Sequence, residues 1–321
     1  MMERYIVNGI NVRKIASTNT RMLSHRDFIE NIWNYGMIKP VTFHLAPTDE
    51  CNLSCDFCSV KDRGGNELTL EQCKMVIDTY AKLGAKSMEL TGGGDPLMYP
   101  HLIEVIEHAK HRGLAIGLIT NGIALNDYEL SWTKDLTWMR ISLSGIDFDA
   151  EDIYLDINSD EIKTYLGCSY VIGKNTTKEK LKQTHDVARH LKSEYVRIVP
   201  NCYSTSDIEW ARTYAPLQIK DYPEMFLQIK DYNTPPMCYW RYVKPFVNSD
   251  GWVYQCSTCS LFTGYFSEHW RVARIEYIKS IYEKGVHSFG TSRCRLCFYT
   301  TQNQLLHDLM ISKDVVHKEF I

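Results

Sequence analysis

Three cysteines lie within eight residues, in the order Cys51-Asn-Leu-Ser-Cys55-Asp-Phe-Cys58. The apolar run at residues 41–46 precedes them and is typical of a buried strand, and residues 47–50 carry the chain into a loop. Three thiolates on one short loop can bind three irons of a cubane 4Fe–4S cluster, which leaves the fourth iron open to a bound molecule. Zinc is the alternative, but structural zinc takes four ligands, usually in two separated pairs. The spacing therefore favours an iron–sulfur cluster with one open iron.

A glycine-rich segment follows this loop. Thr91-Gly-Gly-Gly-Asp-Pro96 comes directly after the strand-like run Ser87–Leu90 and begins 33 residues after Cys58. Alone, such a run is typical of a turn. Together with the C-x3-C-x2-C spacing and the aromatic residue before the last cysteine, it resembles the signature of radical S-adenosylmethionine (SAM) enzymes. The resemblance implies that SAM binds the open iron and that its methionine amino group is held by Gly92, Gly93, Gly94 and Asp95, where many members have Glu instead of Asp95.

The composition limits the function classes. The 321 residues are 44% hydrophobic and 23% charged, which is ordinary for a globular protein with one large domain and a smaller one. A net charge of −3 gives no overall basic field for nucleic acid or an anionic membrane, although a confined basic groove stays open. No apolar run approaches the roughly 18 residues that span a bilayer. With eleven cysteines and no secretory signal, we expect metal ligation rather than disulfides, a cytoplasmic location and no membrane partner.

Strand-like and helix-like segments alternate from residue 41 onwards. The strand candidates cover residues 41–46, 87–90, 114–120, 139–143, 169–172 and 195–199. The helix candidates cover residues 69–83, 101–111 and 177–191, and the first of them starts at a Thr cap and ends at Gly84. This alternation predicts an α/β fold with a parallel sheet and helices outside it. The resemblance implies a partial (β/α)6 TIM-like barrel of the radical SAM type over residues 41–205.

Residues 1–40 form an N-terminal extension with one predicted helix at residues 24–34, capped by Ser24. The extension is too short for a separate peptide-recognition domain. Many peptide-modifying members of the family carry a leader-binding domain, so its expected absence argues against that class without excluding it.

Polar residues follow the ends of two predicted strands, in Thr120-Asn121-Gly122 and in Ser142-Leu-Ser144-Gly145. Ligands of parallel α/β sheets bind beyond the C-terminal ends of the strands. Outside the family context, both segments are ordinary turns. The resemblance implies that Asn121, Ser142 and Ser144 contact SAM, although many relatives have Asp in place of Ser144. It also implies that Phe57 packs near the adenine.

Residues 147–156 carry five carboxylates. These would suit a cationic substrate if they lined the mouth of the pocket. The simpler interpretation is a solvated cap before a helix, and we favour it.

A second group of cysteines comprises Cys238, Cys256, Cys259, Cys294 and Cys297. It follows residues 206–237, which show few regular patterns and are predicted to be a linker. Residues 239–254 are typical of a hairpin that turns at Ser249-Asp-Gly251. We expect its aromatic residues to form the hairpin core rather than a base-stacking platform, namely Tyr239, Trp240, Tyr242, Trp252 and Tyr254.

Two ligand sets are possible in this second group. The pairs Cys256-x2-Cys259 and Cys294-x2-Cys297 have the spacing of a zinc ribbon. The spacing of Cys238, Gly251 and Cys256 instead resembles the opening of the SPASM and twitch extensions of radical SAM enzymes, with the last two cysteines as the closing pair. That resemblance implies a twitch-like auxiliary-cluster domain at residues 238–321, in which a second 4Fe–4S cluster is bound by Cys238, Cys256, Cys294 and Cys297. Cys259 is then left over or replaces one of the four.

The remaining cysteines are Cys73, Cys168 and Cys202. We expect the first two to be buried, inert thiols. Cys202 lies just past the last predicted barrel strand, where it is a candidate hydrogen-atom donor. Arg197 on that strand is a candidate to hold the SAM carboxylate or a substrate group, and a structural arginine is the alternative.

The resemblance implies a function. Reductive cleavage of SAM would yield a 5′-deoxyadenosyl radical that abstracts hydrogen from a small polar substrate, and the auxiliary cluster would accept an electron in a net oxidation or rearrangement. An external one-electron reductant of the flavodoxin or ferredoxin type would then be a partner. A maturase that modifies a peptide, or an enzyme that modifies a nucleotide or nucleic acid, is the alternative. A zinc-stabilised binding module is the non-enzymatic alternative, and it gives no role to the glycine segment.

Overall fold

The computed structural model describes residues 6–7, 10–11, 19–230, 232–262 and 264–312. In this part of the chain, the largest sheet has ten strands in the order β13-β12-β11-β3-β4-β5-β6-β7-β8-β9. Strands β3 to β9 are all parallel to their neighbours. Their bounds are β3 (Thr42–Leu45), β4 (Ser87–Leu90), β5 (Ala115–Thr120), β6 (Trp138–Ser142), β7 (Tyr165–Ile172), β8 (Val196–Pro200) and β9 (Met225–Leu227).

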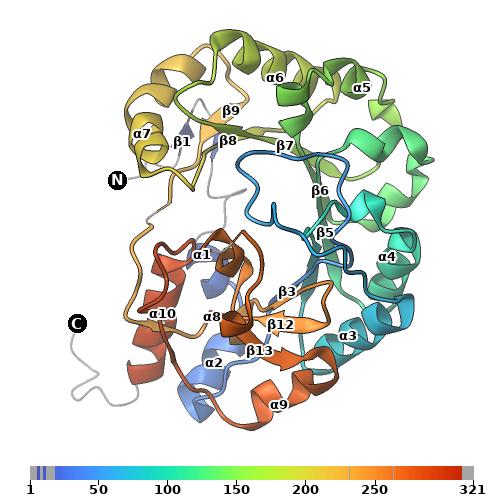
Figure 1. Cartoon of the computed structure of the whole chain (residues 1–321). Coiled ribbons are helices and arrows are strands. Elements are labelled where there is room, and N and C mark those ends of the chain that lie inside the picture. The colour runs from blue at the N-terminus through green and yellow to red at the C-terminus, as the bar shows by residue number, and fades with distance from the viewer. Residues whose placement is uncertain (1–5, 8–9, 12–18, 231, 263, 313–321) are drawn as a thin grey trace.

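Helices connect most of these strands and cover the outside of the sheet (Figure 1). They are α3 (Leu70–Lys82), α4 (Leu102–His111), α5 (Glu151–Leu155), α6 (Lys178–His190) and α7 (Thr205–Ile219), while two 3-10 turns, Ile123–Asp127 and Leu130–Asp135, connect β5 to β6. This arrangement confirms the predicted α/β fold and the partial barrel. Helix α3 begins where predicted, because the Thr69 side chain and Gln72 form a reciprocal capping box. It ends before Gly84, which has a φ of +97°.

Two sequence predictions about segment boundaries are wrong. Residues 206–237 are not simply a linker, because most of α7 and all of β9 lie there and add a seventh parallel strand to the barrel sheet. Ser24 does not cap the next helix, α2 (Arg26–Tyr35), whose N-cap residue is His25. The Ser24 hydroxyl instead donates to the Arg21 carbonyl at 2.6 Å, in the preceding helix α1 (Asn19–Leu23). The strand predicted at residues 169–172 is confirmed as the end of β7, which starts four residues earlier.

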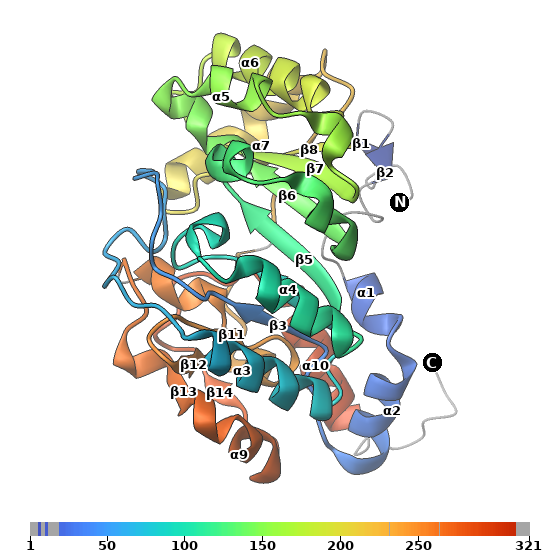
Figure 2. The ribbon, with the colours of Figure 1, turned by 90° about the vertical axis from the view of Figure 1, so that its right-hand side faces the viewer.

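The C-terminal part continues the barrel sheet. Strand β11 (Phe246–Val247) pairs in parallel with β3, and then β12 (Trp252–Tyr254) and β13 (Arg271–Arg274) add in antiparallel fashion. The hairpin predicted at residues 239–254 is present only over residues 246–254, because residues 240–243 form a helix instead of a strand, and the hairpin extends the barrel sheet directly. The remaining elements are α8 (Trp240–Val243), α9 (Ile278–Glu283) and α10 (Thr300–Ile311), with the short pairs β1 (Ile6–Val7) with β2 (Ile10–Asn11) and β10 (Met237–Cys238) with β14 (Phe289–Gly290). Figure 2 shows α10 beside α2, in agreement with their packing contacts.

Successive side chains along the strands point alternately to the apolar outer face and to the polar inner face of the sheet. On β3, Phe43 is fully buried beneath α3 and stacks on Tyr80 with 4.5 Å between ring centroids, while His44 lines the interior. Gly117 leaves room inside the barrel for the ring of Trp138, because a Cβ on it would lie 2.3 Å from that ring. The interior holds a cavity of about 510 Å³. None of the helices in the described ranges is long and apolar enough to cross a membrane.

Candidate active site

The first three cysteines lie half-buried on the loop that follows β3, and polar groups approach each sulfur. The Asn121 amide lies 3.8 Å from Cys51 Sγ, and Arg63 Nη1 lies 3.5 Å from Cys58 Sγ. Burial and the neighbouring sulfurs raise the pKa of Cys55 to about 11, although a hydrogen bond from Ser144 opposes this rise. Donors that point at sulfur are typical of the surroundings of metal-bound thiolates.

The glycine segment holds the start of this loop by close backbone packing. The Gly94 N–H donates to the Thr48 carbonyl at 2.8 Å, and the Asp95 N–H donates to the Glu50 carbonyl at 2.7 Å. A Cβ on Gly94 would lie 1.8 Å from the Glu50 oxygen, and one on Gly93 would lie 2.5 Å from Asp49. Only glycine permits this approach. The segment therefore positions the residue just before Cys51.

Asp95 is buried and uses both carboxylate oxygens within the protein. Its Oδ1 accepts from Thr120 Oγ1 at 2.7 Å and from the Leu97 N–H at 2.9 Å, and its Oδ2 accepts from the Asn121 N–H at 2.6 Å. Burial raises the pKa of Asp95, and these three donors oppose the rise. Asp95 thus ties the glycine segment to the end of β5. Its contact with SAM stays a prediction.

The ends of β5 and β6 are joined through a tyrosine that the sequence did not single out. Tyr154 is fully buried, its hydroxyl donates to the Asn121 carbonyl at 2.9 Å, and it accepts from the Gly145 N–H at 3.0 Å. Beside it, the Ser142 and Ser144 hydroxyls lie 2.9 Å apart. The structure thus brings Asn121, Ser142 and Ser144 to one edge of the sheet, next to the cysteine loop.

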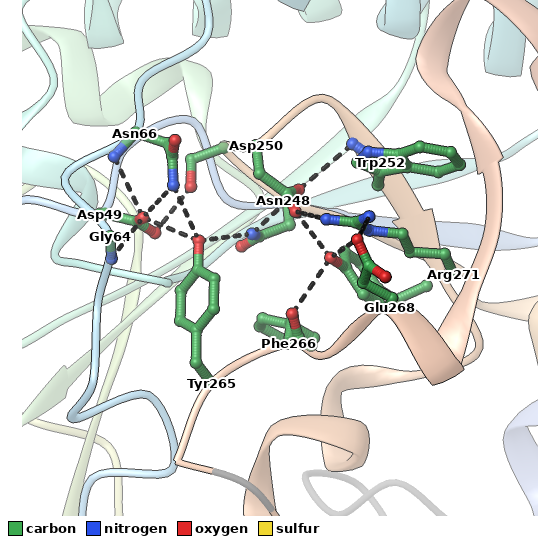
Figure 3. Close-up of polar contacts among 12 residues, drawn as sticks. Asp49, Gly64, Asn66, Asn248, Asp250, Trp252, Tyr265, Phe266, Glu268 and Arg271 are labelled. Carbon is green, nitrogen blue, oxygen red and sulfur yellow. Dashed lines mark hydrogen bonds and ion pairs between the residues drawn. The ribbon is translucent and has the colours of Figure 1, made fainter.

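A buried carboxylate links the cysteine loop to the C-terminal hairpin (Figure 3). Asp49 Oδ2 accepts from the Gly64 N–H at 3.3 Å, from the Asn66 N–H at 3.1 Å and from the Tyr265 hydroxyl at 2.8 Å, while Oδ1 accepts from the Ser249 hydroxyl at 2.6 Å. The network continues from Tyr265 through Asn248, Asp250, Tyr254 and Arg271. Asp49 is only 2% exposed. A buried carboxylate with this many donors fixes the two segments against each other.

The interior cavity borders both cysteine groups. Its lining includes Ser59, which follows Cys58, together with Thr91 and Gly92 of the glycine segment. The lining also includes Ser257 and Ser260, which flank the second group. The predicted catalytic residues Cys202 and Arg197 line the same cavity. Burial raises the pKa of the Cys202 thiol, which lies 3.7 Å from the Tyr232 hydroxyl.

An ion-pair network lies in the lining of this cavity. Glu89 of β4 accepts from His44 Nε2 at 2.8 Å and from Lys244 Nζ at 2.7 Å. Burial alone would raise the pKa of Glu89, but Lys244 and His44 outweigh it and hold that pKa well below its usual range. Burial and Lys244 lower the pKa of His44. Glu89 is the one carboxylate among the described residues that line the cavity.

Two other predicted features lie outside the cavity lining. None of the five carboxylates in residues 147–156 lines it, and Asp149 pairs with Lys180 on the outer surface. This finding supports the solvated cap. Phe57 is half-buried on the cysteine loop and does not line the cavity, so its packing on adenine stays a prediction. Cys73 and Cys168 are buried, as expected.

The second group of thiols gathers from three places in the chain. Cys256 acts electrostatically on the pKa of Cys238, Cys294 and Cys297, and its sulfur lies 3.7 Å from that of Cys259. Two sulfurs accept backbone N–H groups, since Trp240 N lies 3.4 Å from Cys238 Sγ and Tyr299 N lies 3.3 Å from Cys297 Sγ. Cys256 thus lies within electrostatic reach of the other four thiols that the sequence grouped.

Both groups offer donor sets that fit iron–sulfur clusters. In the described part of the chain, no three Cys, His, Asp or Glu side chains are arranged to hold a single metal ion. The first loop supplies three half-buried thiols with N–H groups directed at two of the sulfurs. The second group supplies four predicted ligands, two of which already accept backbone N–H bonds. Thiol ligands with such N–H donors suit cluster binding at both places.

Several residues of the site were missed by sequence reasoning. They are Asp49, Arg63, Glu89, Arg140, Tyr154, Lys230 and Lys244. A basic residue inside an otherwise apolar strand, as in Met139-Arg140-Ile141, was a usable signal for Arg140. The same kind of signal, a charged residue between apolar neighbours in a strand, was available for Glu89 in Met88-Glu89-Leu90. The remaining residues depend on strand register or on contacts between distant segments, and local sequence does not show these.

Known proteins are similar in sequence to part of the barrel region. Residues 45–200 match the family model described as the radical SAM superfamily. The PqqA peptide cyclase of Bradyrhizobium diazoefficiens is 34% identical over 113 residues, which cover 34% of this chain and 30% of that enzyme. The GTP 3′,8-cyclase of Staphylococcus epidermidis is 30% identical over 131 residues, which cover 37% of each protein. The matches thus span about a third of the length of these relatives.

Solved structures share the fold. Streptococcus suis SuiB bound to the precursor peptide SuiA has a TM-score of 0.54 at 12% identity, with 78% of this chain and 67% of that chain covered. Native anSMEcpe with bound AdoMet and the Cp18Cys peptide has a TM-score of 0.51 at 13% identity, with 85% of this chain and 96% of that chain covered. At such identities the likeness shows the fold alone. Residues 45–200, which contain the cysteine loop, the glycine segment and strands β4 to β8, are the part of this chain that is similar to the radical SAM superfamily.

Proposed function

We propose that this protein is a radical SAM enzyme that oxidises or rearranges a small polar substrate held in the barrel cavity. One observation carries the proposal. A single cavity is lined by Gly92 and by Ser59 beside the first cysteine group, and also by Ser257 and Ser260 beside the second. A substrate in that cavity would lie between two sets of thiol ligands. This arrangement suits a reaction that removes a hydrogen atom at one place and an electron at the other.

In this proposal, Cys51, Cys55 and Cys58 hold a 4Fe–4S cluster by three points. When bound, this cluster would supply the electron for reductive cleavage of SAM, and the resulting 5′-deoxyadenosyl radical would take a hydrogen atom from the substrate. Close backbone packing at Gly93 and Gly94 holds the start of the cysteine loop, and Gly92, Gly93, Gly94 and Asp95 would hold the methionine amino group of SAM. Asn121, Ser142 and Ser144 offer polar groups for SAM at the strand ends, and Phe57 offers an apolar ring for its adenine. The barrel walls exclude water and stray hydrogen donors.

We further propose that Cys238, Cys256, Cys294 and Cys297 hold an auxiliary 4Fe–4S cluster of the twitch type, which supplies a one-electron acceptor. The overall reaction is then an oxidation of the dehydrogenase kind, and it needs an external reductant such as a flavodoxin or ferredoxin to start each cycle. Cys202 in the cavity wall is a candidate hydrogen-atom donor. Arg197 is a candidate to bind the substrate, and its place in the cavity is developed below.

A second candidate function is the modification of a peptide or nucleotide. The observations that favour it are the sequence likeness to a PqqA peptide cyclase and to a GTP 3′,8-cyclase. A cavity of about 510 Å³ favours a small molecule or a single side chain over a folded partner. A peptide substrate would therefore place one of its residues in the cavity. This second function then differs from the first only because the group in the cavity belongs to a peptide and not to a free small molecule.

The test is the iron and sulfide content, with EPR spectra, of anaerobically reconstituted protein. Two thiolate-held 4Fe–4S clusters correspond to about eight irons per chain. We expect the variant Cys51→Ala/Cys55→Ala/Cys58→Ala to retain about four irons and to lose formation of 5′-deoxyadenosine from SAM. Cys73→Ala/Cys168→Ala is the matched control, because both residues are buried away from the two groups, and it should keep the full iron content.

Other outcomes are equally informative. About four irons that fall to none in the triple variant, with zinc retained, would leave the radical step and remove the auxiliary acceptor. Zinc without iron or sulfide in the unmodified protein would overturn the enzyme proposal and leave a zinc-stabilised binding module.

A further inference from the structure

The cavity is lined by more positive than negative charge. Arg140 of β6, Arg197 of β8, Lys230 after β9 and Lys244 before β11 all face it. The single carboxylate in the described lining is Glu89, and it is already paired with Lys244 and His44. Within the described ranges, no carboxylate pairs with Arg140, Arg197 or Lys230. We call these three side chains the cation triad.

Aromatic rings and one amide hold the triad in place without neutralising it. The Arg140 guanidinium lies 5.5 Å from the ring centre of Trp138, and Lys230 Nζ lies 5.2 Å and 5.3 Å from those of Phe298 and Tyr299. Such cation–π contacts orient a cation and leave its N–H donors free. Arg197 donates to Gln228 Oε1 at 3.2 Å.

Two donors of the triad are buried and lack a partner. Arg140 Nε and Arg197 Nε are both inaccessible and make no hydrogen bond within the described residues. An unpartnered buried N–H on a charged group is unfavourable, and native proteins rarely keep one without a reason. Two such donors around one cavity indicate that an acceptor is missing from it.

The charges of the triad also repel one another. Burial and the nearby Arg140 lower the pKa of Arg197 to about 9, and burial with Arg197 and Lys244 lowers the pKa of Lys230 to about 7. An anion among the three cations would remove this repulsion and satisfy the free donors. The alternative is that water alone hydrates three structural cations, and this predicts no preference for anions.

We propose that the substrate carries an oxyanion group, a carboxylate or a phosphate, which the cation triad of Arg140, Arg197 and Lys230 binds inside the barrel. Guanidinium groups match the geometry of both oxyanions through paired N–H bonds. Phe298 and Tyr299 then lie beside the adjoining part of the substrate. This inference rests on the proposed function, in which a substrate carbon loses a hydrogen atom. A substrate anchored by its oxyanion would present that carbon toward the cysteine loop.

The depth of the triad separates it from the expected SAM site. Arg140 precedes Ser142 by two residues on β6, and this corresponds to about 6.6 Å along the strand at about 3.3 Å per residue. The residues predicted to contact SAM lie at or beyond the strand ends. An anion on the triad therefore lies deeper in the barrel than the expected SAM site. A small molecule or one amino-acid side chain can bridge the distance between the triad and that site.

The test measures binding of simple anions to the full-length chain at constant ionic strength. Inorganic phosphate and succinate are titrated separately by calorimetry and by thermal unfolding. We expect saturable binding and a raised melting temperature with at least one of them. We expect Arg140→Gln/Arg197→Gln to weaken that binding by about tenfold for each arginine. The matched control is Arg189→Gln/Arg212→Gln, two exposed arginines that make the same change in net charge, and it should bind as the unmodified protein does.

The outcomes separate the possible results. Tighter binding of phosphate indicates a phosphorylated substrate, and tighter binding of succinate indicates a carboxylate. The inference is wrong if neither anion binds saturably, or if the two double variants lose binding equally. If the first double variant does not unfold cooperatively, Lys230→Met replaces it and must show the same loss. The triple cysteine variant should still bind the anion, so failure of the triad and failure of the radical chemistry are distinguished.

Discussion

The two cysteine groups of this protein are built in opposite ways. The first places Cys51, Cys55 and Cys58 on one loop, where side chains of other elements approach the sulfurs. The second gathers thiols from β10, from the turn after β12 and from the loop before α10, and two of its sulfurs accept backbone N–H groups. Local sequence creates the first site, and tertiary structure creates the second. We therefore expect the first group to contribute mainly to reactivity and the second to contribute also to stability.

The largest expected effect comes from removing the centre of the second group. Cys256→Ala should lower the free energy of unfolding of the iron-loaded protein by about 5 kcal/mol or more, because structural metal sites contribute roughly 10 kcal/mol to folding. Cys55→Ala should cost about 1 kcal/mol, since the glycine segment and Asp49 also hold its loop. Both values come from anaerobic guanidinium unfolding. Equal losses in the two variants would break the comparison.

A companion measurement sharpens the same comparison by defining the second ligand set. Metal content after Cys238→Ala and after Cys259→Ala distinguishes a twitch-type set from a zinc ribbon. We expect the first variant to lose the metal and the second to keep it. The reverse result would favour the ribbon and would make Cys259 a ligand.

The next effect concerns the contact between the two regions. Asp49→Ala removes the acceptor for Gly64, Asn66, Ser249 and Tyr265 and leaves buried donors unpaired. We expect it to lower the free energy of unfolding by about 3 kcal/mol. Tyr265→Phe should cost about 1 kcal/mol, because it removes one hydroxyl from the network.

Hydrogen exchange would show which segments lose protection in Asp49→Ala. We expect faster exchange both in residues 49–66 and in β11 and β12. Faster exchange in the loop alone would mean that the two regions are not coupled through Asp49. Asp49→Asn, which keeps the shape and one acceptor oxygen, is the matched control and should have a smaller effect.

The smallest expected effect is a pH dependence that belongs to the barrel interior. The pKa of His44 is lowered by burial and by Lys244, so below about pH 6.5 the unfolded chain binds a proton that the folded chain does not. Stability is therefore complete above this pH and falls as the pH is lowered toward the folded-state pKa, by at most about 1.4 kcal/mol per pH unit. His44→Gln should flatten this part of the profile. His111→Gln, on the exposed side of α4, is the control, and an equal flattening there would contradict the prediction.

Much of the barrel could be predicted because its signals are local. Apolar alternation and a Thr cap locate β4 and α3, and the three loop cysteines need no distant partner. Helix α7 was missed because apolar residues also lie on its exposed side, at Tyr214 and Leu217, and because Pro216 lies inside it. Strand β9 has only three residues. The cation triad and the Asp49 network join residues far apart in the chain, so strand register and packing determine them.

The hydrogen bonds of Asp49 also have a consequence for the order of folding. Its partners Ser249 and Tyr265 lie 200 and 216 residues further along the chain. At synthesis rates of roughly 5–20 residues per second, these partners follow Asp49 by about ten to forty seconds. During that interval β3 lacks its neighbour β11, and the loop with Cys51 lacks its anchor. The site for the first cluster is therefore completed late, after most of the barrel strands have left the ribosome.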